Sequence, residues 1–249
     1  MIVKVEKLSK SFGNHVVLDE VSLTVEEAEN LVVFGRSGTG KSVLLKCIVR
    51  LLQPDSGTVF IFGKDVMSLK IDELNELRQQ IGFLFQGAAL YDSMSVRANL
   101  DFPLVRHSNL TPKEREKRIK SVLEKVSLEE AIDKMPADLS GGMKKRIGLA
   151  RAIITEPKLM LYDEPTTGLD PITAKEISKL ITDLQHELKM TSIIVTHDIL
   201  CAKIIADRAV VLDNGKLQYE GNLNDLTTSA DPFLKNFFSD ELVEETRRK

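Results

Sequence analysis

Short runs of apolar residues recur along the chain, and each ends in polar or glycine residues. The runs at 31–34, 81–85, 159–162 and 192–196 are rich in Leu, Ile, Val, Met and Phe. Their length and uniform hydrophobicity predict buried strands of a parallel sheet. Near the N-terminus, in residues 2–34, apolar and polar positions alternate instead, which predicts strands with one exposed face. The pattern as a whole predicts one globular α/β unit.

Turn and cap residues mark where these elements begin and end. Asp-Ser-Gly at 55–57 predicts a turn into a strand, and Asn-Gly at 214–215, between two apolar runs, is a strong hairpin signal. Thr111 followed by Pro112 predicts a helix start, and the pattern stays helical to about residue 155. The tail beyond residue 231 is apolar and then charged, and the sequence does not decide whether it docks on the body or on a partner.

The loop after the first buried strand fits the phosphate-binding pattern G-x-x-x-x-G-K-[ST]. Such glycines let backbone N–H groups converge on phosphate oxygens, and the start of the following helix favours negative charge. We assign the Lys41 ammonium to the β- and γ-phosphates of ATP and the Ser42 hydroxyl to Mg²⁺. A glycine-rich turn with an exposed lysine is the alternative, which the strand–loop–helix context disfavours. The loop consists of Gly35, Arg36, Ser37, Gly38, Thr39, Gly40, Lys41 and Ser42.

Polar residues at the ends of other buried strands complete a candidate catalytic group. Asp163 and Glu164 follow the run at 159–162. Asp163 suits the Mg²⁺ shell, and Glu164 suits polarising the attacking water. Gln86 and His197 also follow strands and, taken alone, would be capping or packing residues. Because open α/β sheets gather ligands at the carboxyl ends of their strands, we include both in the site.

A second phosphate cradle, Leu139 to Gly142, opens a predicted helix. One nucleotide needs only one cradle for its phosphates. The second cradle, with Ser140, Gly141 and Gly142, is therefore expected to serve another copy of the chain. This arrangement predicts a two-chain clamp driven by ATP.

Together these motifs resemble the nucleotide-binding subunit of ABC transporters, in the order and spacing of that family and over nearly the whole chain. The resemblance implies an α/β fold with a P-loop NTPase (RecA-like) core sheet, an antiparallel β subdomain and an inserted α-helical subdomain. It implies an ATPase domain at 1–225, with the helical subdomain at about 87–155, and a C-terminal extension at 226–249.

The resemblance also implies roles for single residues. Phe12 corresponds to the aromatic residue that stacks on adenine, and His197 to the switch that senses the γ-phosphate. Gln86 corresponds to the residue that touches Mg²⁺ and the attacking water and links them to the membrane partner. The signature at 139–142 corresponds to the contact with the γ-phosphate held by the opposite subunit, and Asp170 to an aspartate that crosses the dimer interface.

One position departs from the family pattern. Met143 stands where most signatures carry glutamine. Because backbone N–H groups and the Ser140 hydroxyl contact the phosphate, we expect ATPase activity to survive. The departure puts in question any contact that the glutamine side chain makes to the nucleotide.

Composition narrows the class of partner. The 249 residues carry a net charge of −3, which gives no overall electrostatic reason to expect nucleic acid as a partner. The chain has no apolar run of membrane-spanning length, so we expect a separate permease to cross the membrane. Cys47 and Cys201 lie in helical patterns and are expected to be core residues, not a disulfide or metal pair.

A narrower resemblance concerns the transported substrate. The segments at 87–96, 99–104, 135–136, 139–143 and 168–172 and the tail from Asp231 resemble the ATPase of Mla-type phospholipid transporters. This implies a homodimer at the cytoplasmic face of a bacterial inner membrane, with an integral membrane permease and an MCE-domain lipid-binding protein. An ABC ATPase for another solute, such as an amino acid, and a soluble ABC assembly ATPase are the alternatives.

Overall fold

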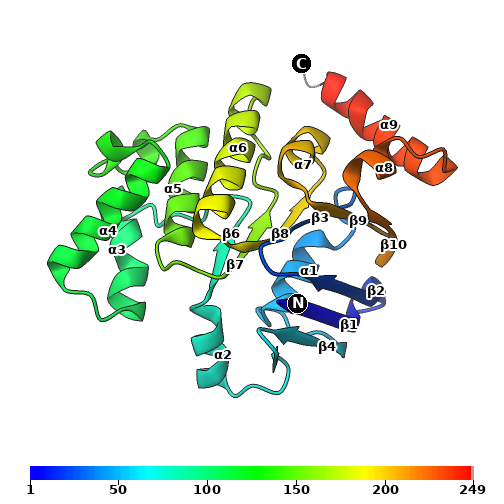
Figure 1. Cartoon of the computed structure of the whole chain (residues 1–249), viewed down its shortest axis with the longest axis horizontal. Helices are drawn as coiled ribbons and strands as arrows, with labels where there is room; N and C mark the ends of the chain where they lie inside the picture. The colour runs from blue at the N-terminus through cyan, green and yellow to red at the C-terminus, as the bar shows by residue number, and fades with distance from the viewer. Residues whose placement is uncertain (248–249) are drawn as a thin grey trace.

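The buried runs of the sequence form a six-stranded sheet at the centre of the molecule (Figure 1). The computed structural model describes residues 1–247, and the side chains of residues 1–239. The strands pair in the order β10-β9-β3-β8-β7-β6, and all except the edge strand β10 run parallel. Their bounds are Asn30–Phe34 for β3, Ile81–Leu84 for β6, Leu159–Asp163 for β7, Thr191–Thr196 for β8, Arg208–Asp213 for β9 and Lys216–Gly221 for β10.

Successive side chains of each central strand enter two different hydrophobic cores, because neighbouring residues of a strand point to opposite faces. On β3, Leu31 and Val33 face one core, while Val32 and Phe34 face the other. All four side chains are fully buried. Burial on both faces explains why these strands are apolar throughout instead of alternating.

A second, antiparallel sheet covers one face. It pairs in the order β2-β1-β4-β5 and shares its core with two helices. The alternating pattern predicted near the N-terminus is confirmed, since buried and partly exposed residues follow one another along β1 and β2. The bounds are Val3–Phe12 for β1, His15–Val25 for β2, Ser56–Ile61 for β4, Lys64–Asp65 for β5, Lys41–Ile48 for α1 and Ile71–Arg78 for α2.

Helices cover the opposite face of the central sheet (Figure 1). The predicted start at Thr111 is confirmed: its hydroxyl accepts a hydrogen bond from Glu114 N–H, and the Glu114 carboxylate accepts one from Thr111 N–H. The helices are α3 Val96–His107, α4 Pro112–Lys125, α5 Gly141–Ile153, α6 Pro171–Leu188 and α7 Ile199–Ile205. The predicted fold class, a P-loop α/β core with an antiparallel β sheet and a helical part, is confirmed.

The helical pattern predicted from 112 to 155 is not continuous. Ser127 has a φ of 55°, a left-handed conformation that ends α4. Two single 3₁₀ turns, Glu129–Ala131 and Pro136–Asp138, fill the gap before α5. Leu128 and Ile132 continue the helical spacing of apolar residues in the sequence. In the structure they lie in the irregular segment between α4 and α5 and pack against the hydrophobic core.

Other local predictions are confirmed. Asn214 and Gly215 have φ values of 47° and 77°, and the left-handed pair makes the tight turn between β9 and β10. Cys47 and Cys201 lie on α1 and α7, buried and not joined in a disulfide. Burial raises the pKa of the Cys47 thiol to about 11. Among the described residues, none of the helices has the length and apolar character needed to cross a bilayer.

The chain ends in two further helices, α8 Leu223–Thr227 and α9 Pro232–Arg247. Helix α9 docks on the body of its own chain, a question that the sequence left open. Leu234, Phe237 and Phe238 are 2–3% exposed. The Phe238 ring meets Phe34, the last residue of β3, edge to face with 5.6 Å between centroids.

An ion pair ties the two sheets together where β2, β3 and β9 meet. The Arg208 guanidinium donates to both carboxylate oxygens of Glu29, at 2.6 and 3.1 Å, and to the Thr24 carbonyl at 2.6 Å. Burial acts to raise the pKa of Glu29, but hydrogen bonds from Arg208 and from the Glu26 N–H outweigh it, so this pKa lies below its ordinary value of 4.5.

We predict that Glu29→Gln lowers the free energy of unfolding by about 1–2 kcal/mol at pH 7, because a charge-assisted bidentate pair is lost. A carboxylate with a lowered folded pKa stabilises the fold above its unfolded pKa and stops doing so as pH falls through the folded value. The difference from the wild type should therefore shrink below about pH 4.5. Urea unfolding at several pH values measures it, with the exposed neighbour Glu27→Gln as the control. An equal difference at pH 7 and pH 3 would refute the assignment.

Candidate functional site

The phosphate-binding loop lies between β3 and α1, at the carboxyl edge of the central sheet. Gly38 and Gly40 have φ values of 83° and 99°, which other residues rarely adopt. A Cβ on Gly40 would lie 2.8 Å from the Val17 side chain, so the loop packs closely against β2 here. A Cβ on Gly38 would meet no atom within 4 Å, so the loop is open on that side.

Lys41, the first residue of α1, is 5% exposed and is held by oxygen atoms. Its ammonium donates to the Gly35 carbonyl at 2.5 Å and the Arg36 carbonyl at 3.1 Å. It also lies 3.1 Å from a carboxylate oxygen of Glu164. The positive charge is thus fixed at the base of the loop.

Ser42 and Asp163 meet although they are distant in sequence. The Ser42 hydroxyl donates to Asp163 Oδ1 at 2.7 Å, from the start of α1 to the end of β7. A hydroxyl and a carboxylate oxygen side by side fit Mg²⁺, which takes few protein ligands and completes its shell with phosphate oxygens and water. Among the described residues, no group of three or more His, Cys, Asp and Glu side chains could hold a metal ion.

Glu164 and His197 form the most constrained part of the site. Glu164 is 7% exposed, and its Oε2 lies 2.8 Å from His197 Nδ1. Its φ of 50° is a left-handed conformation that costs a residue with a side chain about 1–2 kcal/mol. The conformation is held by the Glu164 N–H, which donates to the Val195 carbonyl at 2.9 Å.

Burial acts to raise the pKa of Glu164, but the hydrogen bond from His197 and the charge of Lys41 outweigh it. The net pKa of Glu164 therefore lies below the ordinary value of 4.5. The group is a carboxylate at neutral pH and can accept a hydrogen bond from a water molecule. Strand order explains the cluster: β3, β8 and β7 are neighbours, so Lys41, His197 and Glu164 follow three adjacent strand ends.

The second cradle and Asp170 form a separate group. Ser140 caps α5, since its hydroxyl accepts from Met143 N–H at 3.2 Å. Asp170 caps α6 and accepts from the Thr173 hydroxyl at 2.6 Å. A Cβ on Gly142 would lie 2.7 Å from Thr173, so the two helix starts lie side by side. Helix α5 packs on β6, whereas α1 packs on β7 and β8, so the two cradles occupy different parts of the molecule.

Phe12 and Gln86, the two other predicted site residues, are exposed. The Phe12 side chain, at the end of β1, is 50% exposed, with the Lys10 ammonium 5.6 Å from the ring centroid. Gln86 follows β6 as predicted and joins the cluster through its backbone, because its carbonyl accepts a hydrogen bond from Lys145 at 2.5 Å.

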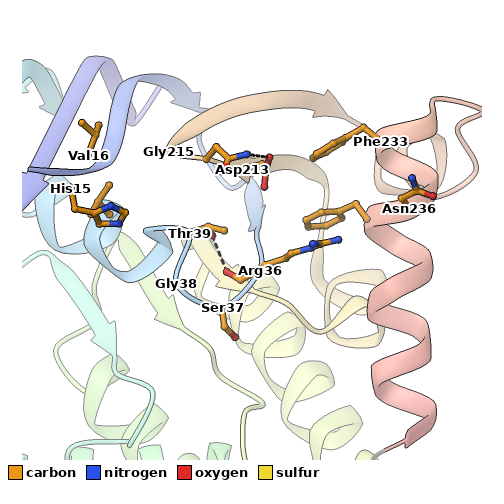
Figure 2. A pocket seen from close by; sticks show the side chains of 13 residues that line it. His15, Val16, Arg36, Ser37, Gly38, Thr39, Asp213, Gly215, Phe233 and Asn236 are labelled. Carbon is orange, nitrogen blue, oxygen red and sulfur yellow. Dashed lines mark hydrogen bonds between the residues drawn. The ribbon is translucent and has the colours of Figure 1, made fainter.

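A pocket of about 630 Å³ opens beside the phosphate loop. Figure 2 shows how four segments that are distant in sequence surround it: the start of β2, the phosphate loop, the hairpin turn after β9 and helix α9. The Thr39 hydroxyl donates to the Arg36 carbonyl within it, and the Arg36 guanidinium lies 6.0 Å from the Phe237 ring. The wall from α9, with Phe233, Asn236 and Phe237, was not predicted, because the sequence alone does not place the tail.

Sequence analysis also missed Lys145. Its side chain is 6% exposed, and its ammonium donates to the backbone carbonyls of Gln86 and Glu164. Burial lowers the pKa of this lysine, although Glu164 and Asp163 act in the opposite direction. One signal was available: Lys145 precedes the buried residues Gly148 and Leu149 by three and four positions, which places a lysine on the apolar face of α5.

These features define an α/β protein of the P-loop nucleotide-binding class. The chain belongs to the ABC transporter family, whose model matches residues 18–167. It is an ATPase of that family, which uses ATP with Mg²⁺. Proteins of this family form dimers and partner with membrane permease subunits.

Solved structures of the family share the fold. The dimeric, post-hydrolysis structure of the ATP-binding cassette MJ0796 with ADP and Pi has a TM-score of 0.82 and 33% identity, covering 89% of this chain and 99% of that one. The structure of cbiO1 from Clostridium perfringens, part of the ABC transporter complex cbiONQ, also has a TM-score of 0.82. It is 30% identical and covers 100% of this chain and 95% of that one.

Curated relatives carry different transport names. The chain is 38% identical over 95% of its length to the "Probable ribonucleotide transport ATP-binding protein mkl" of Mycobacterium tuberculosis, and spans 66% of that protein. It is 40% identical over 89% of its length to the "Methionine import ATP-binding protein MetN" of Rhizobium johnstonii, and spans 61% of that protein. The chain thus spans slightly less than two thirds of these relatives' lengths.

We predict that Lys41→Ala lowers the affinity for MgATP about tenfold or more, because a charge-assisted contact to phosphate is worth at least 1.4 kcal/mol. Equilibrium binding of a fluorescent ATP analogue measures the change. Lys46→Ala, on the same helix but away from the loop, is the control and should bind as the wild type does. Undiminished affinity of Lys41→Ala would contradict the phosphate role.

Proposed function

We propose that the chain is the ATP-hydrolysing subunit of a membrane transporter, in which two copies pair head to tail around ATP. The observation that carries this proposal is the separation of the two cradles. The first cradle lies with Lys41, Ser42, Asp163 and Glu164 at one part of the sheet edge, while the exposed Ser140 faces solvent elsewhere on the same chain. Head-to-tail pairing brings the second cradle of one copy to the first cradle of the other.

In this proposal the first cradle binds the nucleotide. The loop N–H groups and Lys41 hold the β- and γ-phosphates, and Phe12 stacks on the adenine. Ser42 and Asp163 hold Mg²⁺, with Gln86 contacting it from the next strand end. Held there, Mg²⁺ would supply positive charge that neutralises the charge developing on the phosphates in the transition state.

Hydrolysis then depends on the buried cluster and on the opposite copy. Glu164 orients the attacking water for in-line displacement, and His197 holds that carboxylate and senses the γ-phosphate. The N–H groups at the start of the partner's α5, with its Ser140 hydroxyl, stabilise the charge spreading over the γ-phosphate. Asp170 crosses the interface between copies.

We include in this proposal an ATPase domain at 1–225, a helical subdomain at about 87–155 and an extension at 226–249.

We further propose that the transported substrate is phospholipid, in an Mla-type system. The proposal rests on the resemblance of the segments at 87–96, 99–104, 135–136, 139–143 and 168–172 and of the tail to that group, not on the names of the relatives. Its partners are an integral membrane permease and an MCE-domain lipid-binding protein, with this chain at the cytoplasmic face of a bacterial inner membrane. The relative named for methionine import favours the second candidate, an ATPase for another solute such as an amino acid.

A groove on the surface supports the proposal that a permease is a partner. It has a volume of about 670 Å³ and runs along the edge strand β6, between α2 and α3. Four aromatic side chains line it: Phe83, Phe85, Tyr91 and Phe102. An apolar groove of this kind fits a short amphipathic segment of a partner. The groove adjoins Gln86, so such a partner would contact the segment that leads into the site.

We predict that Glu164→Gln retains ATP binding and ATP-dependent pairing but loses turnover about 100-fold or more, because the amide cannot take up the proton or orient the water as a carboxylate does. Phosphate release gives turnover, and gel filtration with ATP gives pairing. Glu187→Gln, an exposed change on α6, is the control. Turnover near the wild-type rate would refute the role of Glu164.

We predict that the tagged chain, extracted gently from membranes of its own host, co-purifies with a permease and an MCE-domain protein. Mass spectrometry of the eluate identifies the partners, and a phospholipid-transfer assay tests the complex. A permease with a solute-binding protein instead would favour the second candidate. Recovery without any membrane protein would overturn the transporter proposal and favour a soluble assembly ATPase.

A further inference from the structure

Helix α5 holds the segment after β6 with two cations, the buried Lys145 and the partly buried Arg151. Lys145 donates to the Gln86 carbonyl at 2.5 Å. Arg151 donates to the Ala88 and Ala89 carbonyls at 3.0 and 2.9 Å. Both alanines have left-handed conformations, with φ values of 59° and 50°. The segment from Gln86 to Ala89 therefore takes its shape from hydrogen bonds to α5.

The same lysine also reaches the catalytic glutamate. Lys145 Nζ donates to the Glu164 carbonyl at 3.2 Å, and its side chain is only 6% exposed. Glu164 is thus held on both sides of its Cα, by Val195 at its N–H and by Lys145 at its carbonyl. A left-handed glutamate persists only where its surroundings fix it, and these two bonds provide that constraint.

The geometry points to a role for Lys145 beyond packing. We propose that Lys145 is a positioning residue that fixes Glu164 for hydrolysis and links it to the segment 86–89. This inference rests on the proposed function, because it takes Glu164 as the residue that orients the water. The Lys145 ammonium bonds both the Gln86 carbonyl and the Glu164 carbonyl. A displacement of the segment 86–89 would therefore change how firmly the backbone of Glu164 is held, and with it the position of the Glu164 carboxylate.

The site does not need Lys145 to hold nucleotide. The loop, Lys41 and the Ser42–Asp163 pair make their contacts without it. A positioning role therefore predicts a loss of turnover at unchanged affinity, whereas a general structural role predicts that affinity, stability and turnover fall together.

The first test compares Lys145→Met, Lys145→Arg and the wild type, each purified from the host with its co-purifying membrane subunits. Lys145→Met should lower kcat about 10- to 100-fold, because small misplacements of a catalytic group cost rates of this order. KM and the affinity for a fluorescent ATP analogue should change less than about twofold. Lys145→Arg keeps the charge and several N–H donors and should restore about half of the turnover. Lys120→Met, which removes an ammonium that is 68% exposed on α4, is the matched control.

The second test separates positioning from packing. In a Glu164→Gln background, Lys145→Met should cause no further loss of turnover, because residues that act through one group are not additive. Full kcat in Lys145→Met, or losses that add in the double variant, would overturn the inference. Parallel loss of affinity and of the unfolding midpoint in Lys145→Met, without rescue by Lys145→Arg, would also overturn it. If Glu164→Gln itself retains turnover, the proposed function fails, whatever Lys145 does.

Discussion

The structure of the site depends on one electrostatic constraint: charges buried at the sheet edge must compensate one another. Lys41 and Glu164 are 5% and 7% exposed, and each would be strongly destabilising without the other. Their contact requires the end of β7 to lie close to the start of the helix that follows β3. Strand β8 lies between the two and brings His197 to the same carboxylate. The order of the central strands, the left-handed turn at Glu164 and the close approach of Asp163 to Ser42 all serve this arrangement.

The two candidate phosphate cradles, at 35–42 and 139–142, lie apart from each other in one chain. The first lies at the carboxyl edge of the central sheet, between β3 and α1, and the second lies at the exposed N-terminus of α5, beside the start of α6. Helix N-termini attract anions, but the Ser140 hydroxyl and the Asp170 carboxylate already cap theirs within the chain. The caps keep both helix starts ordered within one chain, so the surface that the proposed pairing uses is already formed.

Much of this could be predicted from the sequence because strand ends can be located along a chain. The apolar run before Asp163 and Glu164, and the one before His197, place these residues at one edge of a parallel sheet. The Asn214–Gly215 turn and the cap at Thr111 follow from local conformational preferences. What failed or stayed open depends on tertiary contacts. The pattern from 112 to 155 could not reveal the turn at Ser127, and Lys145 binds backbone carbonyls, which have no sequence signature. The position of α9 depends on aromatic packing that only the folded chain displays.

That packing has a consequence for how the protein is made. Phe34 ends the strand that leads into the phosphate loop, and it is covered by Phe238 from α9. The two rings are separated by about two hundred residues of chain, so their contact forms late and over a long closed loop. During synthesis the strand emerges early, and its neighbours β8 and β9 follow only after residue 190. The surroundings of the phosphate loop are therefore completed last, although the loop itself is encoded near the start. A polypeptide that ends before α9 leaves the Phe34 end of β3 partly uncovered.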